Sequence, residues 1–311
     1  MATSVIKEKR TIGARTDKIF YAFLVAWPIL HFCVFYIGIN FNSFLLSFQK
    51  ITLDTANGGY VKIFTFDTFK DVFALISSKI ILKATGMSIL SYAVTQIISL
   101  PLSLFFSYYI AKKFKFAGFF RVILFLPSIL SGLVMATLYQ YFIDYSVMGI
   151  VEKILGTKGL IKPMQQGEVT QYCILMFYNI WIGFGSGVLL YSNTMSGISP
   201  EIYDAAAIDG AVGFNEFRYV SLPLSFSTIS VFLVTGITTI FTHQQSLYTF
   251  FGDSAPFQTL GYYVFVQTNA ANGNLTHYPK LACLGLVMSA VCIPITLTLR
   301  HLLEKHGPNE N

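Results

Sequence analysis

Charge-free apolar stretches alternate with short polar connections along most of the chain. Six of these stretches contain no Asp, Glu, Lys or Arg, and each can hold a membrane-spanning helix of roughly 20 mostly apolar residues. They lie between Lys18 and Lys50, Lys83 and Lys112, Arg121 and Asp144, Glu168 and Glu201, Arg218 and Asp253, and Lys280 and Arg300. The pattern predicts an all-α membrane protein with transmembrane helices over about 19–39, 84–111, 119–143, 170–194, 224–246 and 281–300.

A seventh charge-free stretch, from Ser254 to Pro279, has a different character. It contains Pro256, Gly273 and several asparagines, and its apolar run from Leu260 to Val266 is too short to cross a bilayer. We expect a loop with a short helix that lies at the outer surface or re-enters the membrane.

The composition supports this class. Hydrophobic residues make up 54% of the chain and charged residues 12%, whereas soluble domains carry about 25% charged residues. A compact soluble enzyme is therefore nearly excluded. The net charge of +6 comes from basic residues that flank apolar stretches, so membrane topology explains it better than nucleic-acid binding. The cysteines all lie in predicted spans without a C-x-x-C pair, and they indicate neither a disulfide nor a metal site: Cys33, Cys173, Cys283 and Cys292.

Short basic segments predict the orientation. Lysines and arginines gather in the N-terminal tail, 1–18, and in the tight connection from Lys112 to Arg121. Such segments stay in the cytoplasm. An even number of spans then places both termini there, with a six-helix membrane domain over 19–303 and a C-terminal tail over 304–311.

The connection between the fourth and fifth spans, 195–223, carries the most specific pattern. Ser199 suits a helix N-cap and Pro200 suits the first helical turn. Gly210 can end that helix in a left-handed conformation. A second short helix should run from Phe214 and end before Pro223. Two small helices joined at a glycine are expected to project from the membrane.

This connection resembles the E-A-A-x3-G-x9-I-x-L-P signature of permeases of bacterial ATP-binding-cassette importers. The signature is carried, with its spacing intact, by Asp204-Ala205-Ala206, Gly210 and Val220-Ser221-Leu222-Pro223. The departures are Asp for Glu at 204 and Val for Ile at 220, and the shorter Asp204 has less reach. Two further runs are similar to the sugar-importer branch: Ile202 to Ala211, and Gly118-Phe119-Phe120-Arg121 followed by Leu126-Pro127.

The resemblance implies that the 195–223 connection holds a coupling helix that docks on a separate cytoplasmic ATPase. The residues implied for this contact are Glu201, Asp204, Ala205, Ala206, Asp209 and Gly210. The chain has no G-x-x-x-x-G-K-[ST] phosphate loop. We therefore expect no ATPase activity and no cofactor or metal bound by this chain, with ATP hydrolysed by partner subunits.

The resemblance also implies the partners and the location. They are a second homologous permease, forming a heterodimer, an ATP-binding-cassette ATPase dimer, an extracytoplasmic solute-binding protein and a carbohydrate substrate. The assembly is expected in the bacterial cytoplasmic membrane, with this chain as half of the translocation pathway. The outer segments 40–83 and 251–280 are the natural surfaces for the binding protein.

The end of the fifth span offers substrate-pathway candidates at i, i+3, i+4 and i+7, on one face of a helix: Phe241, Gln244, Gln245 and Tyr248. Aromatic rings stack on sugar faces and amides hydrogen-bond to hydroxyls without net charge. Interhelical hydrogen bonds and interfacial aromatics explain the same residues equally well. Tyr178 and Trp181 in the fourth span are weaker candidates.

Several alternatives remain open from the sequence. A self-sufficient secondary transporter needs ionisable residues within the membrane, and the six charge-free stretches contain none. An importer for a non-sugar solute shares the same signature. The glycines of Gly183-Phe184-Gly185-Ser186-Gly187 favour close helix contact, either with the partner permease or within this chain.

Overall fold

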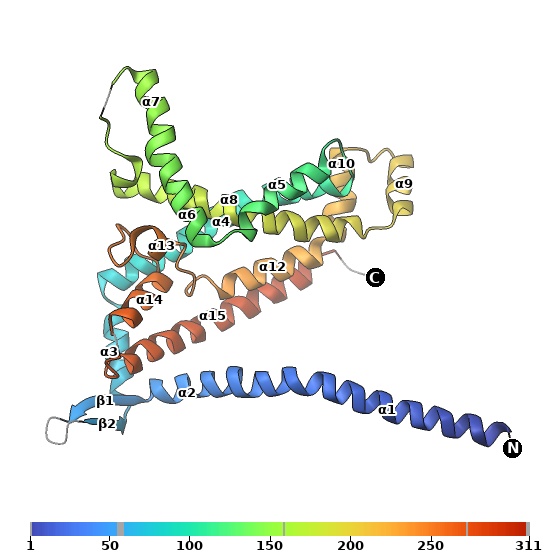
Figure 1. Ribbon diagram of the computed structural model, residues 1–311, viewed down its shortest axis with the longest axis horizontal. Helices are drawn as coiled ribbons and strands as arrows, with labels where there is room; N and C mark the ends of the chain where they lie inside the picture. Colours follow the sequence, from blue (N-terminus) through green and yellow to red (C-terminus); the bar gives the residue numbers. More distant parts are fainter. Residues whose placement is uncertain (1, 55–58, 158, 272, 309–311) are drawn as a thin grey trace. The chain divides into compact units, whose positions relative to one another are not determined.

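The computed structural model describes residues 2–54, 59–157, 159–271 and 273–308, with side chains from Asp17 onward except that of His306. Four basic side chains of the predicted N-terminal tail, those of Lys7, Lys9, Arg10 and Arg15, and residues 309–311 of the C-terminal tail lie outside the described residues. The chain divides into two compact units, Met1–Phe73 with Gly273–Leu286 and Ala74–Asn272 with Val287–Asn311. The structure is predominantly helical, which confirms the all-α prediction (Figure 1).

The first unit opens with one continuous helical rod. It consists of α1 (Ala2–His31), the π-helical turn η1 (Phe32–Ile37) and α2 (Gly38–Ser47). The helix therefore begins well before the predicted start at residue 19. Lys, Arg and Glu are good helix formers, so the polar tail continues the helix that the apolar stretch requires.

A β-hairpin follows the rod, within the long segment between the first two spans. Strand β1 (Gln49–Asp54) pairs antiparallel with β2 (Gly59–Phe64), with Gln49 opposite Phe64. Helix α3 (Asp67–Ile76) comes next, and the Thr65 hydroxyl donates to the Asp67 carboxylate at 3.0 Å. This bond, with the nearby Lys70 charge, lowers the pKa of Asp67. The sequence pattern did not predict this hairpin.

The second unit is built around two long helices, α4 (Lys79–Ala111) and α8 (Glu168–Ser196). Small residues let them approach closely. The Ser107 hydroxyl donates to the Val188 carbonyl at 3.0 Å, and a Cβ placed on Gly187 would lie 2.9 Å from Ser103 Oγ. A Cβ on Gly185 would lie 1.7 Å from the Leu124 carbonyl oxygen of the neighbouring helix. The glycine motif thus packs within this chain.

The third predicted span, 119–143, is not one straight helix. Helix α5 (Ala117–Ile129) is followed by α6 (Gly132–Tyr141), the π-helical turn η2 (Phe142–Val147) and α7 (Met148–Leu155), with a bend of 102° between α5 and the rest. Leu130 has an extended backbone at the break, with ψ 154°, shortly after the donor lost at Pro127. A short 3-10 helix, η3 (Pro163–Gln165), lies between α7 and α8.

The fifth predicted span, 224–246, also differs. Helix α10 (Phe214–Glu216), the π-helical turn η4 (Phe217–Ser221) and α11 (Leu222–Leu224) meet α12 (Phe226–Thr238) at a bend of 65°. The predicted end before Pro223 is wrong, because α11 contains Pro223. A proline lacks the N–H that bonds one turn back, and the wider η4 turn precedes it. Helix α12 ends at Thr238, and 239–246 are not helical.

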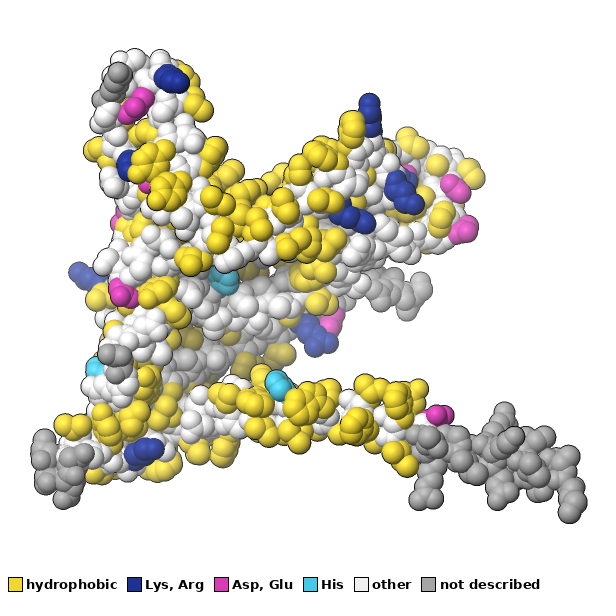
Figure 2. Space-filling view, in the orientation of Figure 1, with side chains coloured by type: hydrophobic (Ala, Val, Ile, Leu, Met, Phe, Trp, Pro, Cys, Tyr) yellow, Lys and Arg dark blue, Asp and Glu magenta, His cyan; other side chains and the backbone are white. Residues whose placement is uncertain are grey.

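The remaining helices are α13 (Leu247–Phe251), α14 (Leu260–Ala270) and α15 (Tyr278–His306). Helix α14 confirms the short helix expected in the seventh stretch. Four helices are long and apolar enough to cross a membrane, or six spans if each bent pair counts as one, over the described residues. Hydrophobic side chains cover much of the visible face (Figure 2), as expected for a chain that faces lipid and membrane partners.

Candidate functional site

The signature connection forms the helical hairpin that the sequence predicts. Helix α9 spans Pro200–Ile208, with Ser199 at the N-cap position, Pro200 in the first turn and Asp209 at the C-cap. Gly210 has φ +84°, a region that favours glycine. The Ala211 N–H donates to the Ala206 carbonyl at 2.8 Å and completes the helix end. We call α9 through α10, residues 200–216, the coupling hairpin.

The outward surface of the hairpin combines acidic and apolar groups. Glu201, Asp204 and Asp209 are exposed, Ala205 is exposed and Ala206 is half-buried. Beside them the sequence analysis missed three exposed apolar side chains: Ile208 at 87%, Val212 at 61% and Phe214 at 61%. The detectable signal was their position in a connection that the sequence predicts to lie outside the membrane. An exposed apolar group rimmed by charge is typical of a protein interaction site.

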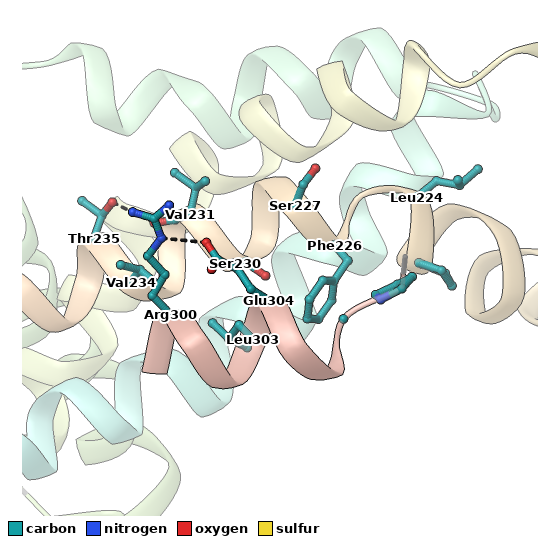
Figure 3. Close-up of a pocket in the computed structure, with 13 residues that line it drawn as sticks. Leu224, Phe226, Ser227, Ser230, Val231, Val234, Thr235, Arg300, Leu303 and Glu304 are labelled. Carbon is teal, nitrogen blue, oxygen red and sulfur yellow. Dashed lines mark hydrogen bonds and ion pairs between the residues drawn. The ribbon is translucent and has the colours of Figure 1, made fainter. Parts of the chain in front are cut away.

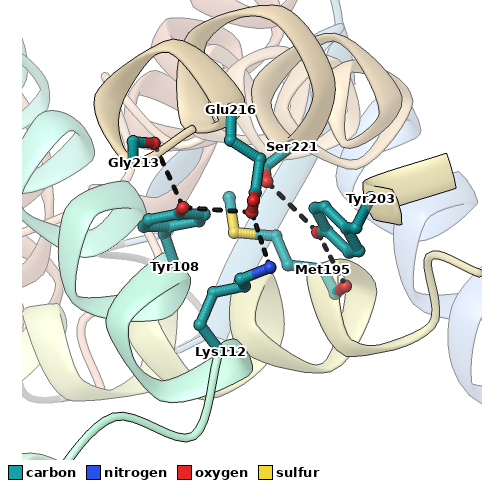
Figure 4. A network of polar contacts seen from close by, with 7 residues as sticks. All are labelled: Tyr108, Lys112, Met195, Tyr203, Gly213, Glu216 and Ser221. Carbon is teal, nitrogen blue, oxygen red and sulfur yellow. Dashed lines mark hydrogen bonds and ion pairs between the residues drawn. The ribbon is translucent and has the colours of Figure 1, made fainter. Parts of the chain in front are cut away.

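A polar network around the buried Glu216 and Ser221 holds the base of the hairpin (Figure 4). The Lys112 ammonium lies 2.7 Å from Glu216 Oε1 and 4.0 Å from the centre of the Tyr203 ring. The Tyr203 hydroxyl lies 3.1 Å from Ser221 Oγ. These groups come from α4, α9, α10 and η4. The sequence analysis used Lys112 only as a topology signal and did not single out Glu216.

The predicted substrate-pathway residues do not share a helix face. Because α12 ends at Thr238, Phe241, Gln244 and Gln245 lie in the non-helical segment and Tyr248 lies on α13. The predicted helical register is therefore wrong. Polar residues and tertiary contacts replace the helix here, and Gln245 has φ +52°. The substrate role of these residues stays a prediction.

Asn179 of α8 supports this non-helical segment. Its Nδ2 donates to the Gln245 carbonyl at 3.0 Å, and its Oδ1 accepts from Ser246 Oγ at 2.9 Å. Gln245 and Ser246 both have positive φ, 52° and 59°, which costs free energy for residues other than glycine. The amide of Asn179 therefore holds a strained backbone between α12 and α13.

Tyr178 and Trp181 lie in an aromatic cluster. Tyr178 is buried at 3% exposure, its hydroxyl donates to the Gly132 carbonyl at 3.3 Å, and its ring is 4.8 Å from Phe250. The Trp181 ring is 6.2 Å from Tyr139 and is 37% exposed. In this conformation Tyr178 is a packing residue, whereas Trp181 keeps an accessible edge.

A cavity of the second unit lies elsewhere. It has a volume of about 1020 Å³ and lies between α12 and the end of α15, where Arg300 pairs with Glu304 at 2.7 Å (Figure 3). Its wall includes Phe226, Val231 and Leu303. It includes none of the predicted substrate-pathway residues. Among the described residues, no group of three or more His, Cys, Asp and Glu side chains is placed to hold a metal ion.

The fold and the hairpin are those of a multi-pass membrane protein, and the sequence is similar to those of permeases of sugar transporters. The chain is 26% identical over 243 residues to the galactooligosaccharides transport system permease protein GanP of Bacillus subtilis, covering 75% of this chain and 57% of GanP. It is 25% identical over 285 residues to the multiple sugar-binding transport system permease protein MsmF of Streptococcus mutans, covering 92% of this chain and 94% of MsmF. No protein-family model matches the sequence.

The fold itself is similar to that of a bacterial transporter that imports the acidic polysaccharide alginate. That similarity has a TM-score of 0.71 at 19% identity and covers 94% of this chain and 97% of the other. The curated homologues are permeases of sugar ATP-binding-cassette transporters, which confirms the resemblance seen in the sequence. The chain spans little more than half of GanP and nearly all of MsmF.

Proposed function

We propose that this chain is the permease subunit of an ATP-driven, binding-protein-dependent importer of oligosaccharides. It forms half of the translocation pathway and couples to a separate ATPase. The observation that carries the proposal is the coupling hairpin, in which Gly210 ends α9 with φ +84° and leaves acidic and apolar groups exposed. A rigid helix with a tight joint suits a lever that another protein moves.

The exposed surface of the hairpin indicates the chemistry of its ATPase partner. Ile208 and Val212 fit an apolar cleft, and burying them there stabilises the contact by removing them from water. Glu201, Asp204 and Asp209 would pair with basic groups at the rim. The small side chains of Ala205 and Ala206 let the partner approach closely. ATP binds to and is hydrolysed by that partner, since this sequence has no phosphate loop.

The other subunits of the proposed importer are those expected for a permease of this kind. A second, different permease completes the pathway, and an extracytoplasmic binding protein delivers the sugar. The alginate transporter has been solved in complex with an alginate pentasaccharide-bound periplasmic protein. The basic short connections support a cytoplasmic location for the coupling hairpin and both termini. The β-hairpin of β1 and β2 and the 251–280 segment then face the binding protein.

The oligosaccharide class is supported by the relatives and by neutral polar chemistry along the pathway. GanP is a galactooligosaccharide permease and MsmF a sugar permease by name. Gln244, Gln245 and Trp181 offer amides and an accessible ring, which suit uncharged hydroxylated substrates. We propose that these residues line the pathway when the spans close around a substrate.

Deletion of this gene in its native host tests the proposal. Uptake of a panel of labelled neutral oligosaccharides is measured in the deletion strain and in strains complemented with the parent chain or with Gly210→Val. We expect loss of uptake of at least one oligosaccharide, rescued by the parent and not by Gly210→Val, because a β-branched side chain disfavours φ +84°. Membrane abundance of both chains is measured by immunoblot.

Gly156→Val is the matched control, since Gly156 also ends a helix, α7, with positive φ of 66° but lies outside the coupling hairpin. It is expected to retain uptake. Unchanged uptake of the whole panel in the deletion strain would reject the proposal. Uphill transport by the purified chain alone in liposomes would reject it as well.

A further inference from the structure

The carboxylate of Glu216 is buried at the base of the coupling hairpin. The residue is 7% exposed, and its Oε1 lies 2.7 Å from the Lys112 ammonium (Figure 4). Among the described residues, Asp144 is the other buried acid. A buried charge is costly unless it is paired and hydrogen-bonded. Glu216 therefore stays where it is only while Lys112 stays beside it.

Lys112 connects both helices of the hairpin, α9 and α10, to the end of α4. It is the C-cap residue of α4, where its N–H donates to the Tyr108 carbonyl at 3.0 Å. Its ammonium contacts Glu216 on α10 and lies over the Tyr203 ring on α9 at 4.0 Å. A cation over an aromatic face is attracted to it. One charged group thus fixes α9 and α10 together to the end of α4.

Tyr108 completes the junction from the same helix. Its hydroxyl lies 3.1 Å from Glu216 Oε1 and 3.1 Å from the Gly213 carbonyl. A hydroxyl has one proton, so it donates to one of these acceptors at a time. The bond to Gly213 ties α4 to the turn between α9 and α10, and the bond to Glu216 ties it to α10, so both acceptors lie on the hairpin.

Helix α9 has little else to hold its direction. None of its nine residues is buried, so it has no apolar core of its own, and apolar contact is in any case non-directional. Its inner contacts are made by Tyr203, whose hydroxyl lies 3.1 Å from Ser221 Oγ and 3.5 Å from the Met195 carbonyl of α8, and whose ring lies under Lys112. The direction of α9 therefore depends on this polar network.

We propose that Lys112 and Glu216 are positioning residues that lock the coupling hairpin to α4, so that the hairpin and α4 move as one body. The locking is a property of this chain alone. Its consequence, that a displacement of α9 by an ATPase reaches α4 and α8 without loss, rests on the proposed function. The locking of the hairpin to α4 and its consequence for transport can be tested separately.

The first test measures the locking in the purified full-length chain in nanodiscs. The four native cysteines are replaced, and spin labels are placed at Leu102→Cys on α4 and Ala207→Cys on α9, both exposed positions. The parent is expected to give one narrow distance distribution. Glu216→Gln and Lys112→Met should each broaden it about twofold, because the direction of α9 loses its charged anchor.

The matched control is Glu168→Gln. Glu168 pairs with Lys83 at 2.8 Å, at the other end of α4, but that pair is exposed. Its variant should keep the narrow distribution. The charge reversal Lys112→Glu with Glu216→Lys should narrow the distribution again relative to either single variant, a rescue that loss of folding does not produce. Narrow distances in Glu216→Gln, or equal broadening in Glu168→Gln, would overturn the proposal.

The second test measures coupling in the assembled transporter. Glu216→Gln is expected to lower the amount of oligosaccharide taken up per ATP hydrolysed by about tenfold, within the range typical of coupling between sites. The charge-reversed double variant, Lys112→Glu with Glu216→Lys, should recover part of the lost uptake per ATP hydrolysed. If distances broaden as expected but even the parent assembly moves no sugar, the locking stands and the proposed function fails. If the parent assembly transports sugar but the spin-label distance distributions of Glu216→Gln and Lys112→Met stay narrow, the proposed function stands and the locking fails.

Discussion

The two ends of α4 carry ion pairs of nearly equal length in different surroundings. At the first end Lys83 lies 2.8 Å from Glu168 of α8, with side chains 61% and 44% exposed. At the last end Lys112 lies 2.7 Å from Glu216, with side chains 27% and 9% exposed. Distance alone does not separate them. Burial does, because water screens the first pair and is largely excluded from the second.

The difference shows where the helix is mechanically anchored. An exposed ion pair is worth about 0–1 kcal/mol, and Glu168 in the first turn of α8 also keeps a favourable interaction with the helix dipole without Lys83. Breaking a buried pair by removing one partner costs about 3–5 kcal/mol, because a charge is left uncompensated. The rigid junction of this chain is therefore at the coupling-hairpin end.

Lys112→Met compared with Lys83→Met gives the largest expected difference. Lys112→Met should lower the free energy of unfolding by about 3–5 kcal/mol, since Glu216 loses its cation in a buried site. Lys83→Met should lower it by about 0–1 kcal/mol. Denaturant titration of the purified chain in detergent measures both. Equal losses would mean that burial does not distinguish the two ends.

A glycine substitution in α8 tests the part of α4 that lies between its two ion pairs, because it weakens the packing of the helices there. Gly185→Ala brings a Cβ to 1.7 Å from the Leu124 carbonyl oxygen, so the helices must shift, at a cost of about 1–3 kcal/mol or more. Gly183→Ala is the matched control, because its Cβ meets nothing within 4 Å. Thermal inactivation of the two variants in the same detergent checks this, and a stable Gly185→Ala protein would argue against the close packing.

Asn179→Leu tests the polar support of the segment after α12. The variant loses three hydrogen bonds, two donated to the Leu175 and Gln245 carbonyls at 2.9 and 3.0 Å and one accepted from Ser246 at 2.9 Å. Because the backbone it supports is strained, we expect a loss of about 1 kcal/mol or more in stability. In the assembled transporter we also expect a raised KM for uptake, since Gln245 shifts. Asn193→Leu, an exposed position on the same helix, should change neither. An unaltered KM in Asn179→Leu would separate this segment from the substrate.

The smallest effect is expected for Glu168→Gln. Loss of the exposed pair should change the free energy of unfolding by about 0–1 kcal/mol, and the change should shrink as salt is raised. Glu216→Gln should keep most of its effect at high salt, because its side chain is only 9% exposed and salt screens a partly buried pair less than an exposed one. Denaturant titrations at low and high salt measure both. A salt-independent Glu168→Gln effect would show that the outer pair is less exposed than its geometry indicates.

Local chemistry made the coupling hairpin predictable. Ser199 and Pro200 begin α9, and Gly210 ends it, because these signals act within one helical turn. The fifth span was predicted eight residues too long, to 246 instead of Thr238. Its charge-free stretch continues past the point where Asn179 of another helix supports a non-helical backbone. The hydropathy pattern of one segment cannot predict a contact that a distant segment makes with it.

The sequence by itself determined the class of this protein: a helical membrane chain whose charge-free stretches must satisfy their backbone internally, with a hairpin bounded by its own capping residues. Tertiary structure decided that Gly185 and Gly187 pack within the chain, that the third and fifth spans bend, and that Glu216 meets Lys112. The reason is physical: helix formation and capping are local, whereas burial and the pairing of charges depend on which distant segments share a volume.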